Sequence, residues 1–316
     1  MNANEFVWSQ KHRPHRIAEC ILPVDLKKTF QQFVDNGDIP NLILAGTAGV
    51  GKTTVAKAML DELDRDYLVI NGSMNGNIDT LRNEIMTFAS TTSFKGPHRK
   101  YVILDEADYI TPLTQASLRN FMEEYSKNCG FIMTCNFLNK IIEPLWSRCS
   151  VVQFKIGNAD KAKLAAQFFK RTCTILDTEN VTYDQKAVAG LIQLYFPDWR
   201  RCLNELQRYA ATGNIDIGIL RNHSAESIEE LIGTLKDRKF NEMRKWIGEH
   251  SDIDSNMLYT ALYDMLPTKL TTPASIADMV IVLADYQKNE AFVANVEINR
   301  VAAMATLMAE LNGTWK

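Results

Sequence analysis

A glycine-rich segment carries the pattern in this chain most suited to chemistry. Residues 46–53 read Gly-Thr-Ala-Gly-Val-Gly-Lys-Thr, which matches GxxxxGK[ST] in full. In such a loop, glycines let backbone N–H groups close around phosphate oxygens, and a following helix adds its partial positive charge. Lys52 is expected to reach the β- and γ-phosphates of ATP, and the Thr53 hydroxyl to bind Mg²⁺. The predicted ATP contacts in this loop are Gly49, Val50, Gly51, Lys52, Thr53 and Thr54.

An acidic group follows a later apolar run. Asp105, Glu106 and Asp108 come directly after the apolar residues 101–104. Asp105 is placed to hold Mg²⁺ through water, and Glu106 to orient and deprotonate an attacking water. An acidic cluster alone is more often a solvated loop. Together with the phosphate loop it favours ATP hydrolysis, because metal and lysine must jointly neutralise the triphosphate.

Asn136 ends the next apolar run, 131–134, which in this topology is expected beside the phosphate loop. A neutral amide there could align the attacking water or the γ-phosphate, which makes Asn136 a candidate catalytic residue. An asparagine that only turns a loop is the alternative interpretation.

The elements that must position these residues alternate in type. Apolar runs at 42–45, 68–70, 101–104 and 131–134 lack the period of two, which is typical of buried parallel strands. Apolar residues at helical spacing lie between them, at 55–63 and at 81–89. The first part of the chain is therefore predicted to be a doubly wound α/β domain with a parallel sheet.

After Phe154 the strands are expected to stop. Helical patterns at 159–176, 184–195 and 198–211, with Asp184 and Asp198 as N-caps, predict a small helical domain. Further amphipathic segments at 227–235, 240–249, 256–266, 275–286 and 293–311 are separated by Pro267 and Pro273. The predicted domains are residues 1–155, 156–220 and 221–316.

Composition places limits on the class of protein. Of 316 residues, 46% are hydrophobic and 23% charged, which is ordinary for a globular protein. No apolar run reaches the ~20 residues that cross a bilayer, and the amino terminus has no basic start before an apolar stretch. We expect no membrane contact and a cytoplasmic location. The six cysteines form no CxxC pair, so a zinc ribbon is disfavoured and reduced thiols are expected.

The sequence resembles the AAA+ clamp-loader family over nearly its whole length. Residues 11–14, Lys-His-Arg-Pro, are similar to its K-x-R-P box, and residues 105–108 to its acidic box. Residues 147–149, Ser-Arg-Cys, match the most specific motif, and residues 198–207 resemble the lid helix. The length and the Phe-Pro-Asp at 196–198 are most similar to the large subunits of T-even-type bacteriophages.

The resemblance implies roles that the residues alone would not give. Arg148 would be an arginine finger that acts in trans on a neighbour's ATP, and Arg200 a lid residue that contacts phosphate in its own site. Without the family, both would be interpreted as surface arginines. The adenine side of the site would be lined by Ser9, Gln10, Lys11, His12 and Ile21.

The resemblance also implies partners. These are other copies of the chain and a smaller clamp-loader subunit in a five-subunit open ring, a sliding clamp, and primer–template DNA. Family members carry a basic residue between the second strand and the DNA-facing helix, but residues 74–77 here include none. Direct DNA contact is therefore expected to rest on Arg82, Arg119 and helix N-termini.

The implied function is ATP-dependent loading of the sliding clamp onto primer–template DNA during replication. The alternatives are an ATPase-dead scaffold subunit of the same kind of assembly, or an AAA+ helicase or helicase loader. The intact Lys52, Asp105, Glu106 and Arg148 argue against a dead subunit. Residues 147–149 and the long C-terminal helical region, suited to a collar, argue against the helicase.

Overall fold

The computed structural model describes residues 6–73, 78–91, 93, 96, 98–211, 213–216, 225–251 and 253–316. The stretch 74–77, where the sequence lacks the expected basic residue, lies outside them. Contacts divide the chain into two units, Met1–Ile215 and Asp216–Lys316. The predicted boundaries at 155 and 220 stay predictions, and each unit is described by itself.

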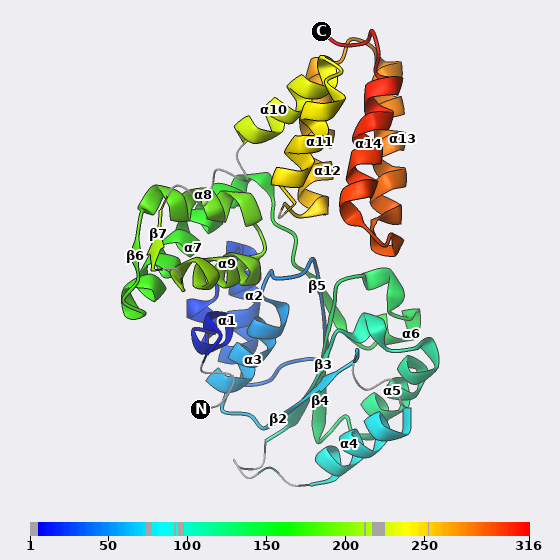
Figure 1. Ribbon diagram of the computed structural model, residues 1–316. Coiled ribbons are helices and arrows are strands. Elements are labelled where there is room, and N and C mark those ends of the chain that lie inside the picture. Colours follow the sequence, from blue (N-terminus) through cyan, green and yellow to red (C-terminus); the bar gives the residue numbers. More distant parts are fainter. Residues whose placement is uncertain are drawn as a thin grey trace. The chain divides into compact units, whose positions relative to one another are not determined.

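A five-stranded sheet forms the centre of the first unit (Figure 1). Its order is β2-β3-β4-β1-β5, and every neighbouring pair is parallel. Each of the four predicted apolar runs forms a strand, but the expected burial was wrong for residues 68–70, because their strand lies at an edge of the sheet and Val69 is exposed. The fifth strand lies at the edge and is mostly exposed, so it has no continuous buried run. The strands are β1 (Leu42–Ala45), β2 (Tyr67–Asn71), β3 (Lys100–Asp105), β4 (Cys129–Cys135) and β5 (Ser150–Gln153).

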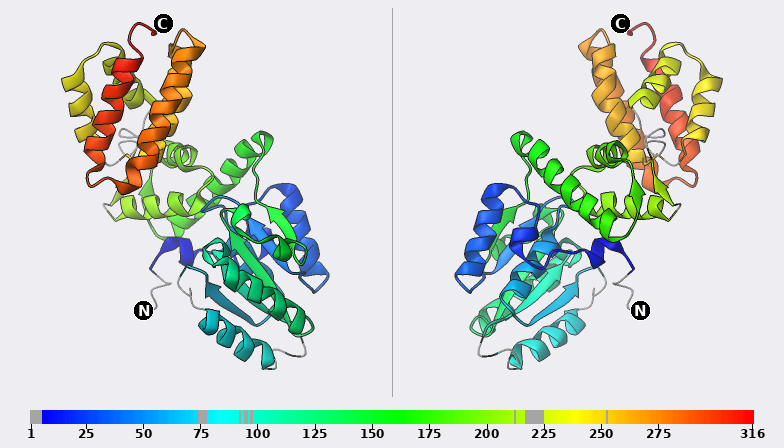
Figure 2. Two further views of the ribbon diagram at one scale, coloured as in Figure 1. Left: turned by 90° about the vertical axis from the view of Figure 1, so that its right-hand side faces the viewer. Right: turned by 90° about the vertical axis from the view of Figure 1, so that its left-hand side faces the viewer.

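Helices cover both faces of this sheet, as Figure 2 shows. Leu42 and Leu44 of β1 pack on one side with α2 (Val24–Asp35) and α3 (Lys52–Glu62). The alternate residues Ile43 and Ala45 face the other side, which is covered by α4 (Ile78–Ser90), α5 (Pro112–Glu124) and α6 (Glu143–Trp146). Burial on both faces explains why β1 is apolar throughout. The predicted doubly wound α/β domain is confirmed.

Three helices follow the sheet and form the lid, α7 (Asn158–Thr178), α8 (Gln185–Tyr195) and α9 (Trp199–Ala210). Asp184 accepts a hydrogen bond from the Lys186 N–H at 2.6 Å, and Asp198 one from the Arg201 N–H at 2.9 Å. Both predicted N-caps are therefore confirmed. The N-terminal helix α1 (Trp8–Lys11) packs against α9.

The expectation that strands stop after Phe154 was wrong in one detail. β6 (Thr182–Tyr183) and β7 (Asn214–Ile215) form a parallel pair beside the lid helices. Two residues are too few to show any periodicity, so the sequence pattern could not reveal them. Short 3₁₀ turns complete the first unit: η2 (Ile17–Glu19), η3 (Ala107–Tyr109) and η4 (Leu138–Lys140).

The second unit is all helical in its described residues, as predicted for the collar region. Its helices share one apolar core. Pro267 does not separate helices, contrary to expectation. It lies in the last turn of α12, while Pro273 begins α13, where its missing N–H costs nothing. The elements are α10 (Ala225–Lys236), α11 (Phe240–Glu249), α12 (Ser255–Lys269), α13 (Pro273–Asn289), η6 (Glu290–Phe292) and α14 (Val296–Glu310).

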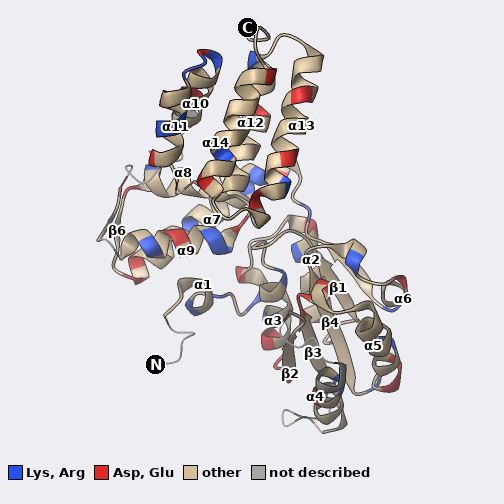
Figure 3. Ribbon diagram, turned by 45° about the vertical axis from the view of Figure 1, so that its right-hand side comes forward, with Lys and Arg blue, Asp and Glu red and all other residues tan. Residues whose placement is uncertain are grey.

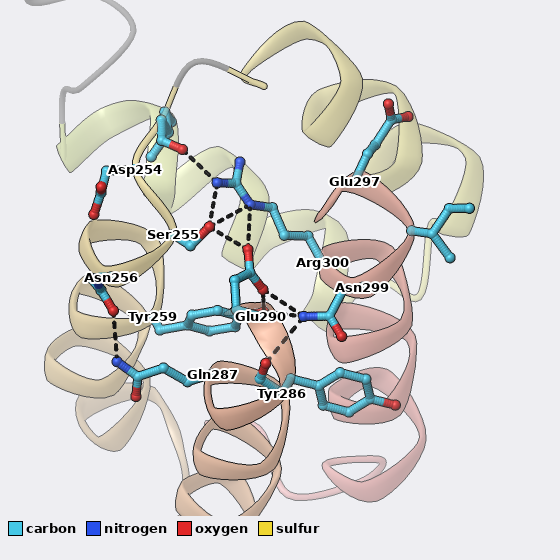
Figure 4. A network of polar contacts seen from close by, with 12 residues as sticks. Asp254, Ser255, Asn256, Tyr259, Tyr286, Gln287, Glu290, Glu297, Asn299 and Arg300 are labelled. Carbon is cyan, nitrogen blue, oxygen red and sulfur yellow. Dashed lines mark hydrogen bonds and ion pairs between the residues drawn. The ribbon is translucent and has the colours of Figure 1, made fainter. Parts of the chain in front are cut away.

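A buried polar network crosses the second unit (Figure 4). The Arg300 guanidinium donates to the Ile253 carbonyl at 2.7 Å and to the Ser255 hydroxyl at 2.6 Å, and it lies 3.5 Å from a Glu290 oxygen. Glu290 also accepts from Tyr259 at 3.1 Å and from Asn299 at 2.5 Å. Arg300 and Asn299 are nearly inaccessible to solvent. These bonds tie the start of α12 to the end of α13 and to α14.

Removal of the arginine should therefore destabilise the second unit. Arg300→Ala would leave the Glu290 carboxylate buried without its cation, a loss that typically costs about 3–5 kcal/mol. We expect a lower denaturation midpoint for this unit, measured by urea unfolding of the full chain. Arg244→Ala, on the exposed face of α11, is the matched control. Equal effects of the two substitutions would contradict the role given to the network.

Candidate nucleotide site

The phosphate loop connects β1 to α3. Gly51, the N-cap of α3, has φ of 95°, and Gly49 has φ of 74°. L-residues with side chains rarely adopt this conformation. A Cβ at Gly49 would also lie 1.8 Å from a carboxylate oxygen of Asp198 in the lid. Glycine is therefore required at position 49 both by the backbone and by the close approach of the lid.

Lys52 begins α3 and points back into the loop. Its ammonium donates to the carbonyls of Gly46 at 2.8 Å and Thr47 at 2.7 Å, and to the Asn136 side-chain oxygen at 2.9 Å. The residue is only 8% exposed, and burial lowers the pKa of Lys52. A desolvated cation of this kind is stabilised by a nearby anion.

Two side chains that carry oxygen ligands suited to Mg²⁺ meet beside the loop. The Thr53 hydroxyl donates to an Asp105 carboxylate oxygen at 2.6 Å, and the Thr134 hydroxyl donates to the same oxygen at 2.6 Å. Mg²⁺ prefers oxygen ligands and takes one or two from the protein, with water and phosphate supplying the rest. Thr53 and Asp105 fit this requirement. No cluster of three or more acidic, His or Cys side chains exists among the described residues, so a site built wholly from such ligands is not found there.

Glu106 follows Asp105 at the carboxyl end of β3. Its backbone adopts a left-handed conformation with φ of 56°, and its N–H donates to the Thr134 hydroxyl at 3.1 Å. A Cβ at Gly72 would lie 2.6 Å from the Glu106 carbonyl oxygen, so the glycine directly after β2 makes room for this turn. Within the described structure no hydrogen bond or ion pair engages the Glu106 carboxylate. The side chain is therefore free to meet a water.

Asp108 supports the end of β4. One of its carboxylate oxygens accepts from the N–H groups of Asn136 and Phe137, each at 3.2 Å. Asn136 in turn accepts from Lys52, so the strand beside β1 reaches the phosphate loop as predicted. Asn136 is thus more than a loop-turning residue, although its catalytic role stays a prediction.

A pocket with a cavity volume of about 120 Å³ opens at the phosphate loop. Among the predicted ATP contacts, Gln10 and Lys11 do not line it. Those that do are Ser9, His12, Ile21, Gly49, Val50, Gly51, Lys52, Thr53, Thr54 and Arg200. Asp105 and Asn136 reach the site through Thr53 and Lys52.

Two more arginines converge on the pocket. Arg13 and Arg200 both line it, and the pKa of Arg13 is lowered by burial and then by the charge of Arg200. The Arg13 Nε is buried and has no hydrogen-bond partner among the described residues. Figure 3 shows the basic residues of α9 and of the segment after α1. Arg13, Lys52 and Arg200, with Arg171 of the lid, surround one pocket, and such a cluster of cations fits a polyanion such as a triphosphate.

The lid supplies pocket residues that the sequence prediction missed. Phe168, Trp199 and Arg171 line it, and the ring centroids of Phe168 and Trp199 are 4.4 Å apart. Arg13 could have been found, because it belongs to the Lys-His-Arg-Pro box. Arg171 and Phe168 carry no local signal, since they lie within a helix of ordinary amphipathic pattern.

Arg201 lies apart from the pocket that Arg200 lines. The Arg201 guanidinium lies 4.6 Å from the centroid of the Tyr195 ring. Of the two adjacent arginines, Arg200 lines the pocket and Arg201 does not, and a contact between Arg200 and phosphate stays a prediction.

Arg148 does not line the pocket of its own chain. It follows α6, and its guanidinium donates to the Glu123 carboxylate of α5 at 2.5 and 2.9 Å and to the Pro144 carbonyl at 2.9 Å. These hydrogen bonds lower the pKa of Glu123. The arginine is thus held on the core surface, away from the phosphate loop of its own chain. A role in trans on a neighbouring subunit stays a prediction.

The two predicted DNA contacts lie on neighbouring helices. Arg82 of α4 is exposed, and its guanidinium lies 6.0 Å from the Phe121 ring centroid of α5. Arg119 of α5 is exposed as well, and lies 3.9 Å from Glu123. Both could meet a phosphate backbone, and their DNA contacts stay predictions.

Comparison with known proteins gives the family. Residues 42–156 match the model of the ATPase family associated with various cellular activities, and residues 160–221 match the AAA+ ATPase lid domain of the sliding-clamp-loader large subunit. The chain is 34% identical to the sliding-clamp-loader large subunit of Enterobacteria phage T4, over 100% of this chain and 99% of the relative. It belongs to the sliding-clamp-loader large-subunit family.

Two further relatives are similar over different lengths of the chain. The large subunit of Escherichia phage RB69 is 32% identical over 100% of this chain and 99% of its own. The replication factor C small subunit of Methanoculleus marisnigri is 33% identical over 77% of this chain and 73% of its own. The α/β core, lid and C-terminal helices expected for the family are confirmed, and the AAA match identifies an ATPase. None of the described helices is long and apolar enough to span a membrane.

Proposed function

We propose that this chain is the ATPase subunit of a clamp loader, which uses ATP to place a sliding clamp on primer–template DNA during replication. The observation that carries the proposal is the convergence of Lys52, Arg13 and Arg200 on a pocket formed jointly by the phosphate loop and the lid. A pocket shared by core and lid closes when a triphosphate draws the cations together, so binding changes the arrangement of the two parts.

Each polar residue of the site has a place in hydrolysis. Lys52 and Arg200 bind the phosphates, Asn136 holds Lys52 or the attacking water, and Glu106 accepts the proton of that water. Thr53 and Asp105 would hold Mg²⁺, which would supply positive charge against the phosphates. Ser9, His12 and Ile21, which line the pocket, would contact the base.

The proposed assembly explains the position of Arg148. In an open ring of five subunits, made of copies of this chain and a smaller clamp-loader subunit, Arg148 of one chain would complete the ATP site of its neighbour. DNA that lies along Arg82 and Arg119 would be recognised by its backbone rather than its bases. DNA contact would then bring Glu106, water and the neighbour's arginine into line, which makes hydrolysis DNA-stimulated.

ATP turnover measured with and without clamp and primed DNA tests this function directly. We expect a low basal rate and a large increase when both are present. A rate that is zero under every condition would favour the ATPase-dead scaffold. A ring of six subunits by electron microscopy would favour a helicase or helicase loader.

Lys52→Ala should abolish most nucleotide binding. The substitution removes a charge-assisted hydrogen bond to phosphate, a loss worth roughly 10- to 100-fold in affinity. Equilibrium titration of the full chain with ATP measures it. Lys127→Ala, at an exposed position on the core, is the control. Unchanged ATP affinity in the Lys52 variant would mean that this loop does not bind phosphate.

A further inference from the structure

The segment between the amino terminus and η2 forms part of the pocket wall. We call residues 6–17 the strap. Ser9, His12, Arg13 and Pro14 of the strap line the pocket together with the phosphate loop. Because the triphosphate must lie against Lys52 and the start of α3, with Arg13 beside it, the part of the strap before Arg13 is left to cover the nucleoside end of the ligand. This placement rests on the function proposed above.

The lid binds the first half of the strap through three side chains. One Glu179 oxygen, at the end of α7, lies 2.7 Å from the Lys11 ammonium and 2.5 Å from the His12 ring nitrogen Nε2. Gln207 of α9 accepts from the Trp8 N–H at 2.9 Å and donates to the Phe6 carbonyl at 2.7 Å. Arg171 of α7 donates to the His12 carbonyl at 2.8 Å.

The second half of the strap is bound to the core instead. The His15 ring nitrogen Nδ1 lies 3.0 Å from the Asp61 carboxylate, and the Ile17 N–H donates to Glu62 at 2.8 Å. Asp61 and Glu62 end α3, the helix that starts at the phosphate loop. The strap therefore passes from lid to core between Arg13 and His15, within the pocket wall.

Glu179 is the lid residue that forms ion pairs with the strap. It and His12 are only 15% and 16% exposed in their side chains, so solvent screens this pair less than a surface ion pair. Burial would raise the pKa of Glu179, but the hydrogen bonds from Lys11 and His12 outweigh it and hold the pKa below its usual value. The carboxylate is thus charged when it holds both strap residues.

We propose that Glu179 is a positioning residue for nucleoside recognition, which holds the strap against the lid so that the strap moves with the lid and covers the base of ATP. Glu179 touches neither phosphate nor metal in this arrangement. Arg13 adjoins the half of the strap that the core binds, so the loss of Glu179 should weaken binding of the nucleoside part and leave binding of the phosphates by Lys52, Arg13 and Arg200 intact.

Inorganic tripolyphosphate separates these two parts of the ligand, because it carries the phosphates without a nucleoside. In Glu179→Gln the amide keeps the size but loses the charge that holds Lys11 and His12. We expect the Kd of Mg-ATP to rise about tenfold, as for loss of a charged hydrogen bond, and the Kd of tripolyphosphate to change less than twofold. The KM for ATP should rise in parallel with little change in kcat.

A matched control lies two residues away. Asp177, also at the end of α7, accepts from the Tyr183 hydroxyl at 3.0 Å. This hydrogen bond lies within the lid and does not involve the strap. Asp177→Asn should leave both Kd values unchanged. Gln207→Ala releases the strap at a second point, and should show the same selective loss of ATP even if the Glu179 variant folds poorly.

Two results would overturn the inference. Equal weakening of ATP and tripolyphosphate by the Glu179 and Gln207 variants would mean a general loss of lid structure. No weakening of either ligand would mean that the strap contacts are incidental. Both results leave the proposed function standing, provided that the Lys52→Ala chain loses ATP and tripolyphosphate together. A wild-type chain that binds neither ligand would overturn the function and the inference alike.

Discussion

Chains that carry Arg148→Ala should still bind ATP in their own phosphate loop, yet slow hydrolysis in the neighbouring subunit by about 10³–10⁵-fold. An arginine offered by a neighbour neutralises charge that develops on the γ-phosphate in the transition state. Its loss therefore reduces the rate of the chemical step and not the affinity of the chain that carries it. Single-turnover hydrolysis in the assembled complex measures the rate, and ATP titration measures the affinity.

The structure supplies the physical reason for an effect in trans. Arg148 is absent from the lining of its own pocket and is bound to Glu123 and the Pro144 carbonyl on the core surface. The Glu123 carboxylate is exposed, so exchange of this partner for a phosphate of the next subunit costs little. A side chain held in this way is pre-positioned at the surface for a neighbour.

Mixed assemblies distinguish action in trans from action in cis. Arg148→Ala chains keep Glu106, and Glu106→Gln chains keep Arg148. Each variant alone should be nearly inactive, but rings that contain both would pair an intact Glu106 with an intact Arg148 of the adjacent chain. Part of the DNA-stimulated activity should return. An arginine that acts in cis gives no recovery at any mixing ratio, and Arg244→Ala chains mixed in the same way control for dilution.

The phosphate loop and the sheet could be predicted because their signals are local. Residues 46–53 form a contiguous motif, and the four predicted strands contain apolar runs, including β2, which lies at an edge and is only partly buried. β5 gave no such signal, because Ser150–Gln153 contains only two apolar side chains and is mostly exposed. Pro267 was misinterpreted for a similar reason: proline lowers helix stability most in the interior, and the last turn of α12 tolerates it.

The contacts that connect lid and strap could not be predicted in this way. Glu179 and His12 are separated by 167 positions, and Gln207 and Trp8 by 199. Residues 11–14 and 198–207 belong to family motifs, but a motif does not indicate which distant residue each of these side chains contacts. Such contacts follow only from the folded arrangement of core and lid. The same limit holds for Arg148, whose expected partner belongs to another subunit.

The second large effect is expected at Glu106. Replacement by glutamine keeps the size of the side chain and the shape of the pocket, but the amide cannot accept a proton from water. Loss of a general base typically slows the reaction by about 10²–10⁴-fold. We expect the Kd for ATP to stay within about twofold of wild type, since the lost group accepts a proton only during the reaction.

The surroundings of Glu106 make this substitution informative. Its backbone is fixed by the bond to Thr134 and by the close approach of Gly72, so the glutamine should occupy the same place. No bond to the carboxylate among the described residues has to be broken by the change. The folded state should thus be unaffected, and a denaturation midpoint equal to wild type checks this. Glu124→Gln, at an exposed position of α5, controls for the loss of one negative charge.

Asp108 is the rival base, and the structure separates the two acids. Asp108 is 6% exposed and accepts from the N–H groups of Asn136 and Phe137, so it supports the strand that carries Asn136. Asp108→Asn should therefore lower stability together with activity, whereas Glu106→Gln should lower activity alone. If the Glu106 variant instead turns over ATP near the wild-type rate while Asp108→Asn is inactive and fully folded, the base is Asp108. The free carboxylate at Glu106 would then have no part in the chemical step.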